Sequence, residues 1–192
     1  MAKVTTYPSG YQNVNMTILS SYANAFDEPS TTNYGTFRSN KLYEGVCYLT
    51  GFNVSSIPQN MIVTEVRLRF RAYWQYNANV ANAHMDLYTG DKLIQEYVYT
   101  IPKTSYTENA EVVIKTELTY EELLNLKIKM VINATVNTQT KGFDLYGVAL
   151  DLFPEEVPIS NDIVISPSSK RKFYLGGTEI KTMYKGSNKI FG

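Results

Sequence analysis

Apolar and polar side chains alternate along two long stretches of the chain. Alternate residues of a strand point to opposite faces of its sheet, so this period of two predicts strands with one buried face. In the first stretch, 62–74, the inward positions are Ile62, Thr64, Val66, Leu68, Phe70, Ala72 and Trp74, and the outward positions are Glu65, Arg67, Arg69 and Arg71. In the second, 126–136, the inward positions are Leu126, Ile128, Met130, Ile132, Ala134 and Val136, and the outward positions are Lys127, Lys129, Asn133 and Thr135.

Shorter strands are predicted between polar turns. They fall at 84–88, 93–100, 111–115 and 143–153, with a turn at 89–92, and further candidates lie at 14–19 and 45–52. Thr119 followed by Glu122 has the spacing of a capping box and predicts one short helix. Regular short strands with polar turns predict an all-β fold, a β-sandwich or jelly roll.

The character of the chain changes after Phe153. Pro154, Pro158 and Pro167, with several serines, predict a connector. Residues 173–180 are then repeated at 183–190, each copy having an apolar or aromatic pair, a Gly turn and a closing Ile, which predicts two small β-hairpins. The predicted organisation is 1–20 as an N-terminal arm or first strands, 21–153 as the sandwich, 154–172 as the connector and 173–192 as a docking element.

The two hairpins are too small to bury a core of their own. Their apolar side chains are therefore candidate assembly contacts: Phe173, Tyr174, Ile180, Met183, Tyr184 and Ile190. We expect them to dock on a neighbouring chain in a homo-oligomer, with a trimer favoured, and docking on the chain's own sandwich is the alternative.

The charge and hydropathy of the chain limit the classes of partner that it is expected to bind. Eighteen basic and eighteen acidic residues give a formal net charge of +0, so no overall field attracts nucleic acid or anionic lipid. No segment has the length and apolarity of a signal peptide or a membrane span, so we expect a protein made in the cytoplasm, with no membrane partner. The single cysteine, Cys47, excludes an intrachain disulfide.

Four segments resemble structural proteins of tailed bacteriophages. Residues 51–67, with Gly51, Phe52, Ile57 and Pro58, are similar to a sequence motif that precedes the first long strand of β-rich virion modules. Residues 22–27 and 143–152 resemble the opening and closing elements of such modules, and the terminal repeat resembles the tails of phage tail, baseplate and fibre proteins.

The resemblance implies a function without catalysis. The chain would be a structural component of the virion, in a tail, baseplate or fibre, attached to other phage virion proteins. A capsid decoration or head-fibre protein, or a carbohydrate-binding module for a host receptor, is the alternative.

Candidate catalytic residues are few. The lone histidine, His84, needs a partnered base or nucleophile, and we expect it to be structural. We expect Cys47 to be a small buried apolar side chain rather than a nucleophile. The acid pairs 121–122 and 155–156 lie at a helix start and in the connector. We therefore expect no catalytic residue, no cofactor and no metal site.

Two sets of predicted surface residues, three arginines and two tyrosines, are candidates for binding a partner. Arg67, Arg69 and Arg71 could contact phosphate or an acidic partner, but cross-strand acids are the favoured partners. Tyr73 and Tyr76 are candidate contacts for a host surface glycan, because sugar-binding sandwiches use exposed aromatic rings.

Overall fold

The computed structural model describes residues 2–18, 22–30, 32–39, 44–74, 80–100, 106–134, 142–156, 164–165, 173–175, 178–180, 183–185 and 188–191. The chain divides into two compact units, Met1–Glu156 and Val157–Gly192. No described helix is long and apolar enough to cross a membrane.

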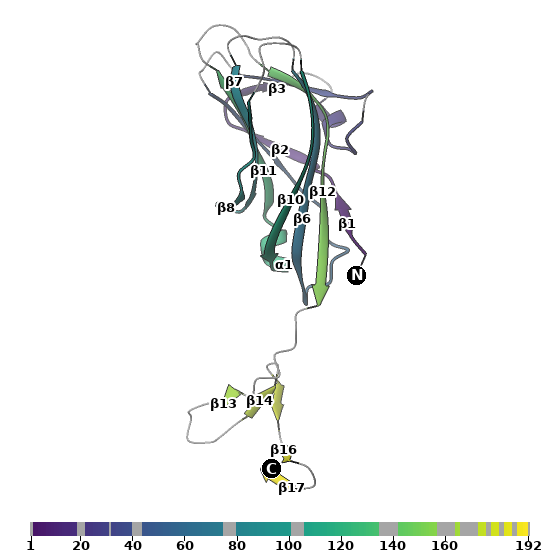
Figure 1. Cartoon of the computed structure of the whole chain (residues 1–192), viewed down its shortest axis with the longest axis vertical. Coiled ribbons are helices and arrows are strands. Elements are labelled where there is room, and N and C mark those ends of the chain that lie inside the picture. Colours follow the sequence, from purple (N-terminus) through teal and green to yellow (C-terminus); the bar gives the residue numbers. More distant parts are fainter. Residues whose placement is uncertain are drawn as a thin grey trace. The chain divides into compact units, whose positions relative to one another are not determined.

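The first unit is a sandwich of two antiparallel sheets that face each other (Figure 1). The first sheet has the strand order β10-β6-β12-β4-β3, and β1 also pairs with β12. Its strands are β1 (Val4–Thr6), β3 (Met16–Ile18), β4 (Gly35–Ser39), β6 (Met61–Trp74), β10 (Tyr106–Leu118) and β12 (Gly142–Glu156). A 3-10 helix, η1 (Tyr22–Ala25), precedes β4.

The second sheet has the order β2-β5-β11-β7-β8, and β9 also pairs with β7. Its strands are β2 (Gly10–Asn13), β5 (Glu44–Thr50), β7 (Val80–Thr89), β8 (Lys92–Gln95), β9 (Val98–Thr100) and β11 (Leu126–Ala134). The fold is therefore all-β, a β-sandwich, as the sequence predicted.

The core lies between the inner faces of the sheets. Leu68 and Phe70 of β6 are 1% exposed, and Ile128 and Met130 of β11 are fully buried. Burying one such side chain contributes about 1.5 to 3 kcal/mol, so the two long strands supply much of the cohesion. The predicted inward positions of β11 are confirmed from Leu126 to Ile132, whereas Ala134 has no described side chain and 135–136 lie outside the described residues.

The prediction for β6 is correct only from Val66 onward. At its start, Met61 and Val63 are buried, and the predicted inward residues Ile62 and Thr64 are half-buried. The register with β12 shifts between Phe153 and Pro154, which leaves one extra residue on β6. Such a bulge inverts the alternation on one side of it.

Several other boundaries also differ from the sequence predictions; β7 and β10, for example, are longer than the predicted 84–88 and 111–115. The single strand predicted at 93–100 is broken at Glu96 and Tyr97 into β8 and β9. Strand β12 runs past the predicted end of the core at Phe153 to Glu156. Strand β4 and the helix η1 were not predicted, because their short segments carry no long alternation, whereas β1 and β2 fall within 1–20, the predicted N-terminal arm or first strands.

The predicted short helix is α1 (Tyr120–Leu123). The Thr119 hydroxyl accepts a hydrogen bond from the Glu122 backbone N–H, and the Glu122 carboxylate accepts one from the Thr119 N–H at 3.0 Å. This capping box confirms the prediction.

The second unit contains β13 (Val164–Ile165), β14 (Phe173–Leu175), β15 (Thr178–Ile180), β16 (Met183–Lys185) and β17 (Asn188–Phe191). Strand β14 pairs with β15, and β16 pairs with β17, so both repeat copies form the predicted hairpins. Strand β13 also pairs with β14, which the repeat did not predict.

Candidate functional site

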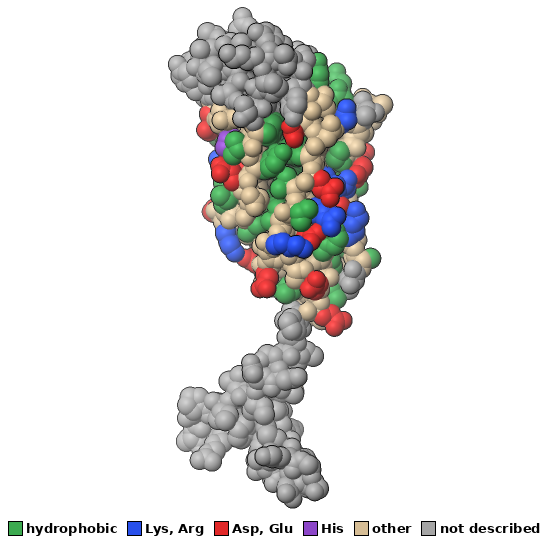
Figure 2. Space-filling model, viewed as in Figure 1, with side chains coloured by type: hydrophobic (Ala, Val, Ile, Leu, Met, Phe, Trp, Pro, Cys, Tyr) green, Lys and Arg blue, Asp and Glu red, His purple; other side chains and the backbone are tan. Residues whose placement is uncertain are grey.

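A groove of about 520 Å³ lies on the outer face of the first sheet, over β6 and β10. We call it the β6 groove. Its lining residues are Glu28, Pro29, Ser30, Thr32, Arg69, Phe70, Arg71, Asn109, Ala110 and Glu111. Charged groups of both signs lie side by side on this part of the surface (Figure 2). The groove thus offers hydrogen-bond donors and acceptors to a ligand.

One wall of the groove is the segment after η1, which a glycine of β12 holds against the sheet. Gly147 has a φ of 137°, and a Cβ there would lie 2.7 Å from the Asp27 carbonyl oxygen and from the backbone of Pro29. The Ser30 N–H donates to the Tyr146 carbonyl at 2.9 Å. Only glycine permits both the conformation and this close approach.

Arg69 forms the floor and is fully engaged. Its Nε and Nη2 donate to the two carboxylate oxygens of Asp151 at 3.0 and 3.1 Å, and its Nη1 and Nη2 donate to Glu28. Lys3 Nζ and Thr5 Oγ1 also donate to Asp151, at 2.9 and 2.7 Å. Two-point pairs of this kind fix geometry as well as charge.

The network shifts the ionisation of both acids. Burial disfavours the charged form of Asp151, but the bonds from Arg69, Lys3 and Thr5 outweigh burial and lower the pKa of that carboxyl. The bond from Arg69 likewise lowers the pKa of Glu28. Both acids are therefore held ionised as partners of Arg69.

Arg67 is also paired. Its Nε donates to Glu65 at 2.6 Å, its Nη1 lies 3.4 Å from Glu111, and its guanidinium lies 4.7 Å from the centre of the Phe153 ring. The sequence favoured acidic cross-strand partners for the arginine row. For Arg67 and Arg69 that prediction is confirmed.

Arg71 differs from its two neighbours. Its Nη1 donates to the side-chain oxygen of Asn109 at 2.8 Å, and its guanidinium lies 5.8 Å from the centre of the Tyr146 ring. Among the described residues it makes no ion pair, and its Nε has no hydrogen-bond partner. Arg71 is thus a groove-lining cation that no described acid neutralises by an ion pair.

Aromatic rings gather beside Arg71. The Tyr34 and Tyr146 rings lie 5.0 Å apart at 44°, and Tyr34 is 41% exposed. Burial raises the pKa of Tyr146, and nearby Asp144, Tyr34 and Tyr73 add to that effect. Tyr73 is half-buried and two residues beyond Arg71 on β6. We call the part of the groove lined by Arg71 and Asn109 its Arg71 end, and the Tyr146 ring lies beside Arg71 there without being part of the groove lining.

Of the residues predicted to bind a partner, the structure places only some near the groove. Tyr73 lies beside this end of the groove, on the arginine face, whereas Tyr76 lies outside the described residues, and no side chain of Trp74 is described. Tyr34 and Tyr146 were not predicted. The candidate assembly contacts lie in β14 to β17, where only the backbone is described: Phe173, Tyr174, Ile180, Met183, Tyr184 and Ile190.

The candidate catalytic residues are placed apart. Cys47 is fully buried in β5, and burial raises the pKa of its thiol to about 12, so it is an inert thiol. Glu122 caps α1, and Glu155 and Glu156 are exposed at the end of β12. His84 lies near two carboxylates on the second sheet.

No family model matches the sequence, and no curated protein matches it. Among solved structures, an arabinose-bound α-L-arabinofuranosidase is similar at a TM-score of 0.48 and 13% identity, over 79% of this chain and 25% of that one. The chain thus spans about a quarter of that enzyme's length.

Two smaller proteins are matched over nearly their whole length. A family 35 carbohydrate-binding module from Clostridium thermocellum has a TM-score of 0.41 and 13% identity, over 80% of this chain and 98% of that one. The C-terminal family 6 carbohydrate-binding module of a marine laminarinase from Zobellia galactanivorans has a TM-score of 0.39 and 8% identity, over 79% of this chain and 100% of that one. At these identities and scores no functional residue is transferred to this chain.

Proposed function

We propose that the sandwich is a non-catalytic glycan-binding domain and that the β6 groove holds the sugar. The observation that carries the proposal is the end of the groove at Arg71. Among the described residues the Arg71 guanidinium has no acidic partner, and it lies beside an amide, Asn109, and the Tyr146 ring, which the exposed Tyr34 ring contacts. Sugars are recognised by this combination, because a flat ring covers their C–H face while donors and acceptors bond their hydroxyls.

The charge balance of the groove favours an acidic sugar. Arg69 is neutralised by Asp151 and Glu28, so Arg71 is the cation that remains for a ligand among the described lining residues. A sugar carboxylate could make a two-point pair with its guanidinium. We therefore expect glycans with uronic or sialic acids to bind more tightly than neutral ones.

The two carbohydrate-binding modules of similar fold agree with this proposal but do not carry it. The non-catalytic part rests on the scattered positions of the candidate acids, Cys47 and His84. Glycan hydrolysis by the purified protein, lost on changing one acid, would contradict it.

We also propose that the second unit attaches the chain to other proteins of a virion. The resemblance of 173–190 to phage tail and fibre repeats supports a virion protein that joins other virion proteins through its second unit, as a trimer. The paired strands of both hairpins support a repeated β-unit. Deleting residues 170–192 should leave a folded sandwich that no longer oligomerises or joins the particle, and normal assembly of the shortened chain would refute the docking role.

A glycan array tests the binding function. The wild-type chain should bind a subset of acidic glycans, and Arg71→Gln and Tyr34→Ala should each lose at least tenfold in affinity while the fold persists. Lys115→Gln is the matched control for Arg71→Gln, because it removes one positive charge from the same sheet at a residue outside the groove lining. Equal binding by Arg71→Gln and Lys115→Gln would exclude the groove.

A further inference from the structure

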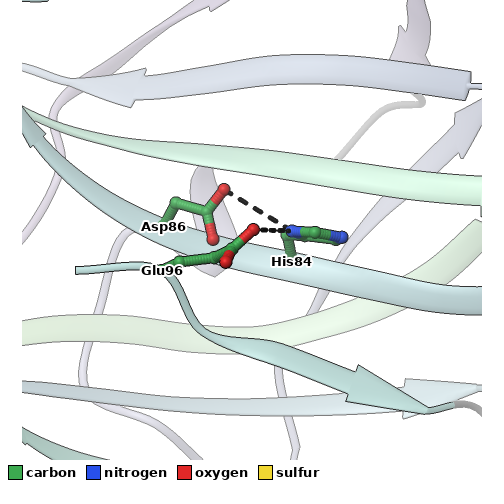
Figure 3. Close-up of side chains that lie close together, drawn as sticks. All are labelled: His84, Asp86 and Glu96. Carbon is green, nitrogen blue, oxygen red and sulfur yellow. Dashed lines mark ion pairs between the residues drawn. The ribbon is translucent and has the colours of Figure 1, made fainter. Parts of the chain in front are cut away.

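Three potential metal ligands converge on the outer face of the second sheet. His84 and Asp86 are alternate residues of β7, and the inward residues Ala83, Met85 and Leu87 between and beside them are fully buried. Glu96 lies at the break between β8 and β9, both of which pair with β7. The three side chains point toward one another (Figure 3).

The ligand atoms are spaced for a small cation between them rather than for direct hydrogen bonds from one side chain to another. His84 Nδ1 lies 3.5 Å from the nearer Glu96 oxygen and 3.7 Å from Asp86 Oδ2, and one ligand atom from each residue lies within 4.8 Å of the others. These distances are too long for strong hydrogen bonds. Ligands held tetrahedrally at the usual metal distances are about 3.4 Å apart, which is close to the two separations from His84 Nδ1.

Asp86 supplies an independent reason to expect a cation. The residue is only 4% exposed, and its Oδ1 accepts the Tyr97 N–H at 3.0 Å. Its Oδ2 lies 3.7 Å from His84 Nδ1, on the side of the carboxylate away from the Tyr97 bond. A largely buried carboxylate that faces an imidazole and a second carboxylate is stabilised by a bound cation.

We propose that His84, Asp86 and Glu96 bind one divalent transition-metal ion of the zinc class. One imidazole nitrogen and two carboxylate oxygens suit Zn²⁺, whereas Ca²⁺ and Mg²⁺ prefer oxygen ligands alone. The Glu96 side chain is 57% exposed, so the ion can enter from solvent and keep a water as its fourth ligand. The site is on the sheet opposite the β6 groove and is independent of glycan binding.

Asn133 of β11 is a positioning residue for this site. Its side-chain nitrogen lies 3.3 Å from His84 Nε2 and donates to Asn82 at 2.6 Å. If both amides are turned over, Asn133 Oδ1 accepts the Nε2 proton and leaves Nδ1 free to bind the metal. Metal ligation by histidine is commonly oriented through its other nitrogen in this way.

Calorimetric titration of the full chain with ZnCl₂, after removal of metal by chelator, tests the site. One equivalent should bind, and a hundredfold excess over the dissociation constant should raise the Tm by roughly 5 to 10 °C. Asp86→Asn keeps the acceptor for the Tyr97 N–H and should weaken binding at least tenfold, as should Glu96→Gln. Affinity should also fall toward pH 5, because protons compete for the ligands.

Glu117→Gln is the control, since it removes one exposed carboxylate from the other sheet. It should bind Zn²⁺ as the wild type does. If Asp86→Asn does not fold, Glu96→Gln decides alone. The proposal is overturned if the wild type shows neither binding nor a rise in Tm, if Glu96→Gln binds as tightly as the wild type, or if Ca²⁺ binds more tightly than Zn²⁺.

Discussion

Arg69 and Arg71 lie two residues apart on one face of β6, yet their surroundings differ. Across the β10 pairing, Arg69 faces an acid, Glu111, and Arg71 faces an amide, Asn109. On the β12 side, Arg69 bonds Asp151 at two points, whereas Arg71 lies over the Tyr146 ring. The same strand periodicity therefore produces a structural cation and a cation available to a ligand, and the neighbouring strands decide which is which.

The largest expected effect is on stability and falls on Arg69. Arg69→Met leaves the Asp151 side chain, 4% exposed, without its two-point partner. Loss of one member of such a pair should lower the free energy of unfolding by about 3 kcal/mol, measured by urea denaturation. Arg71→Met should lower it by less than about 0.5 kcal/mol. Equal losses would remove the distinction between the two arginines.

A smaller loss is expected when the groove wall is pushed away. Gly147→Ala places a Cβ against Asp27 and Pro29 and should destabilise the fold by about 2 kcal/mol. It should also weaken glycan binding, because Glu28 and Ser30 move with that segment. Gly10→Ala meets only an ordinary contact at 3.5 Å and serves as the control. Unchanged stability in Gly147→Ala would show that the wall is not held by this contact.

Acid should act on Arg69 and its partners. The pKa of Asp151 is lowered in the folded protein from an ordinary value of 3.8, so its ion pair stabilises the fold above that value and is lost as pH falls through the folded pKa. The free energy of unfolding should therefore fall as the pH drops below about 4. Asp151→Asn should be less stable at neutral pH and show a shallower fall, and an equally steep fall in the variant would assign the effect to other acids.

The alternation of β6 and β11 predicted the sandwich, and it placed Arg67, Arg69, Arg71 and Tyr73 on one outer face. It could not predict the bulge near Thr64, because Met61, Ile62 and Val63 are all apolar and fit an inward position in either register. The groove combines β6, β10 and the segment 28–32, which are far apart in sequence. Tyr146 and Asn109 therefore gave no signal that they would flank Arg71.

The second site shows the same limit. His84 and Asp86 stand at alternate positions of a predicted strand, but Glu96 belongs to a stretch predicted as one continuous strand. Only the break at Glu96 and Tyr97 brings that carboxylate to His84. A ligand set completed across strands has no spacing that a sequence motif could record.

The central claim is that the Arg71 end of the β6 groove binds glycan. Its most direct test is an NMR titration of ¹⁵N-labelled protein with the best-binding oligosaccharide from the array. We predict the largest shifts in the backbone amides of Glu28, Ser30, Thr32 and Tyr146 and at 69–73 and 109–111, with none of these shifts in Arg71→Gln at the same concentration. Largest shifts on β7 and β11 of the opposite sheet or in the hairpins at 173–191, or full shifts in Arg71→Gln, would contradict it.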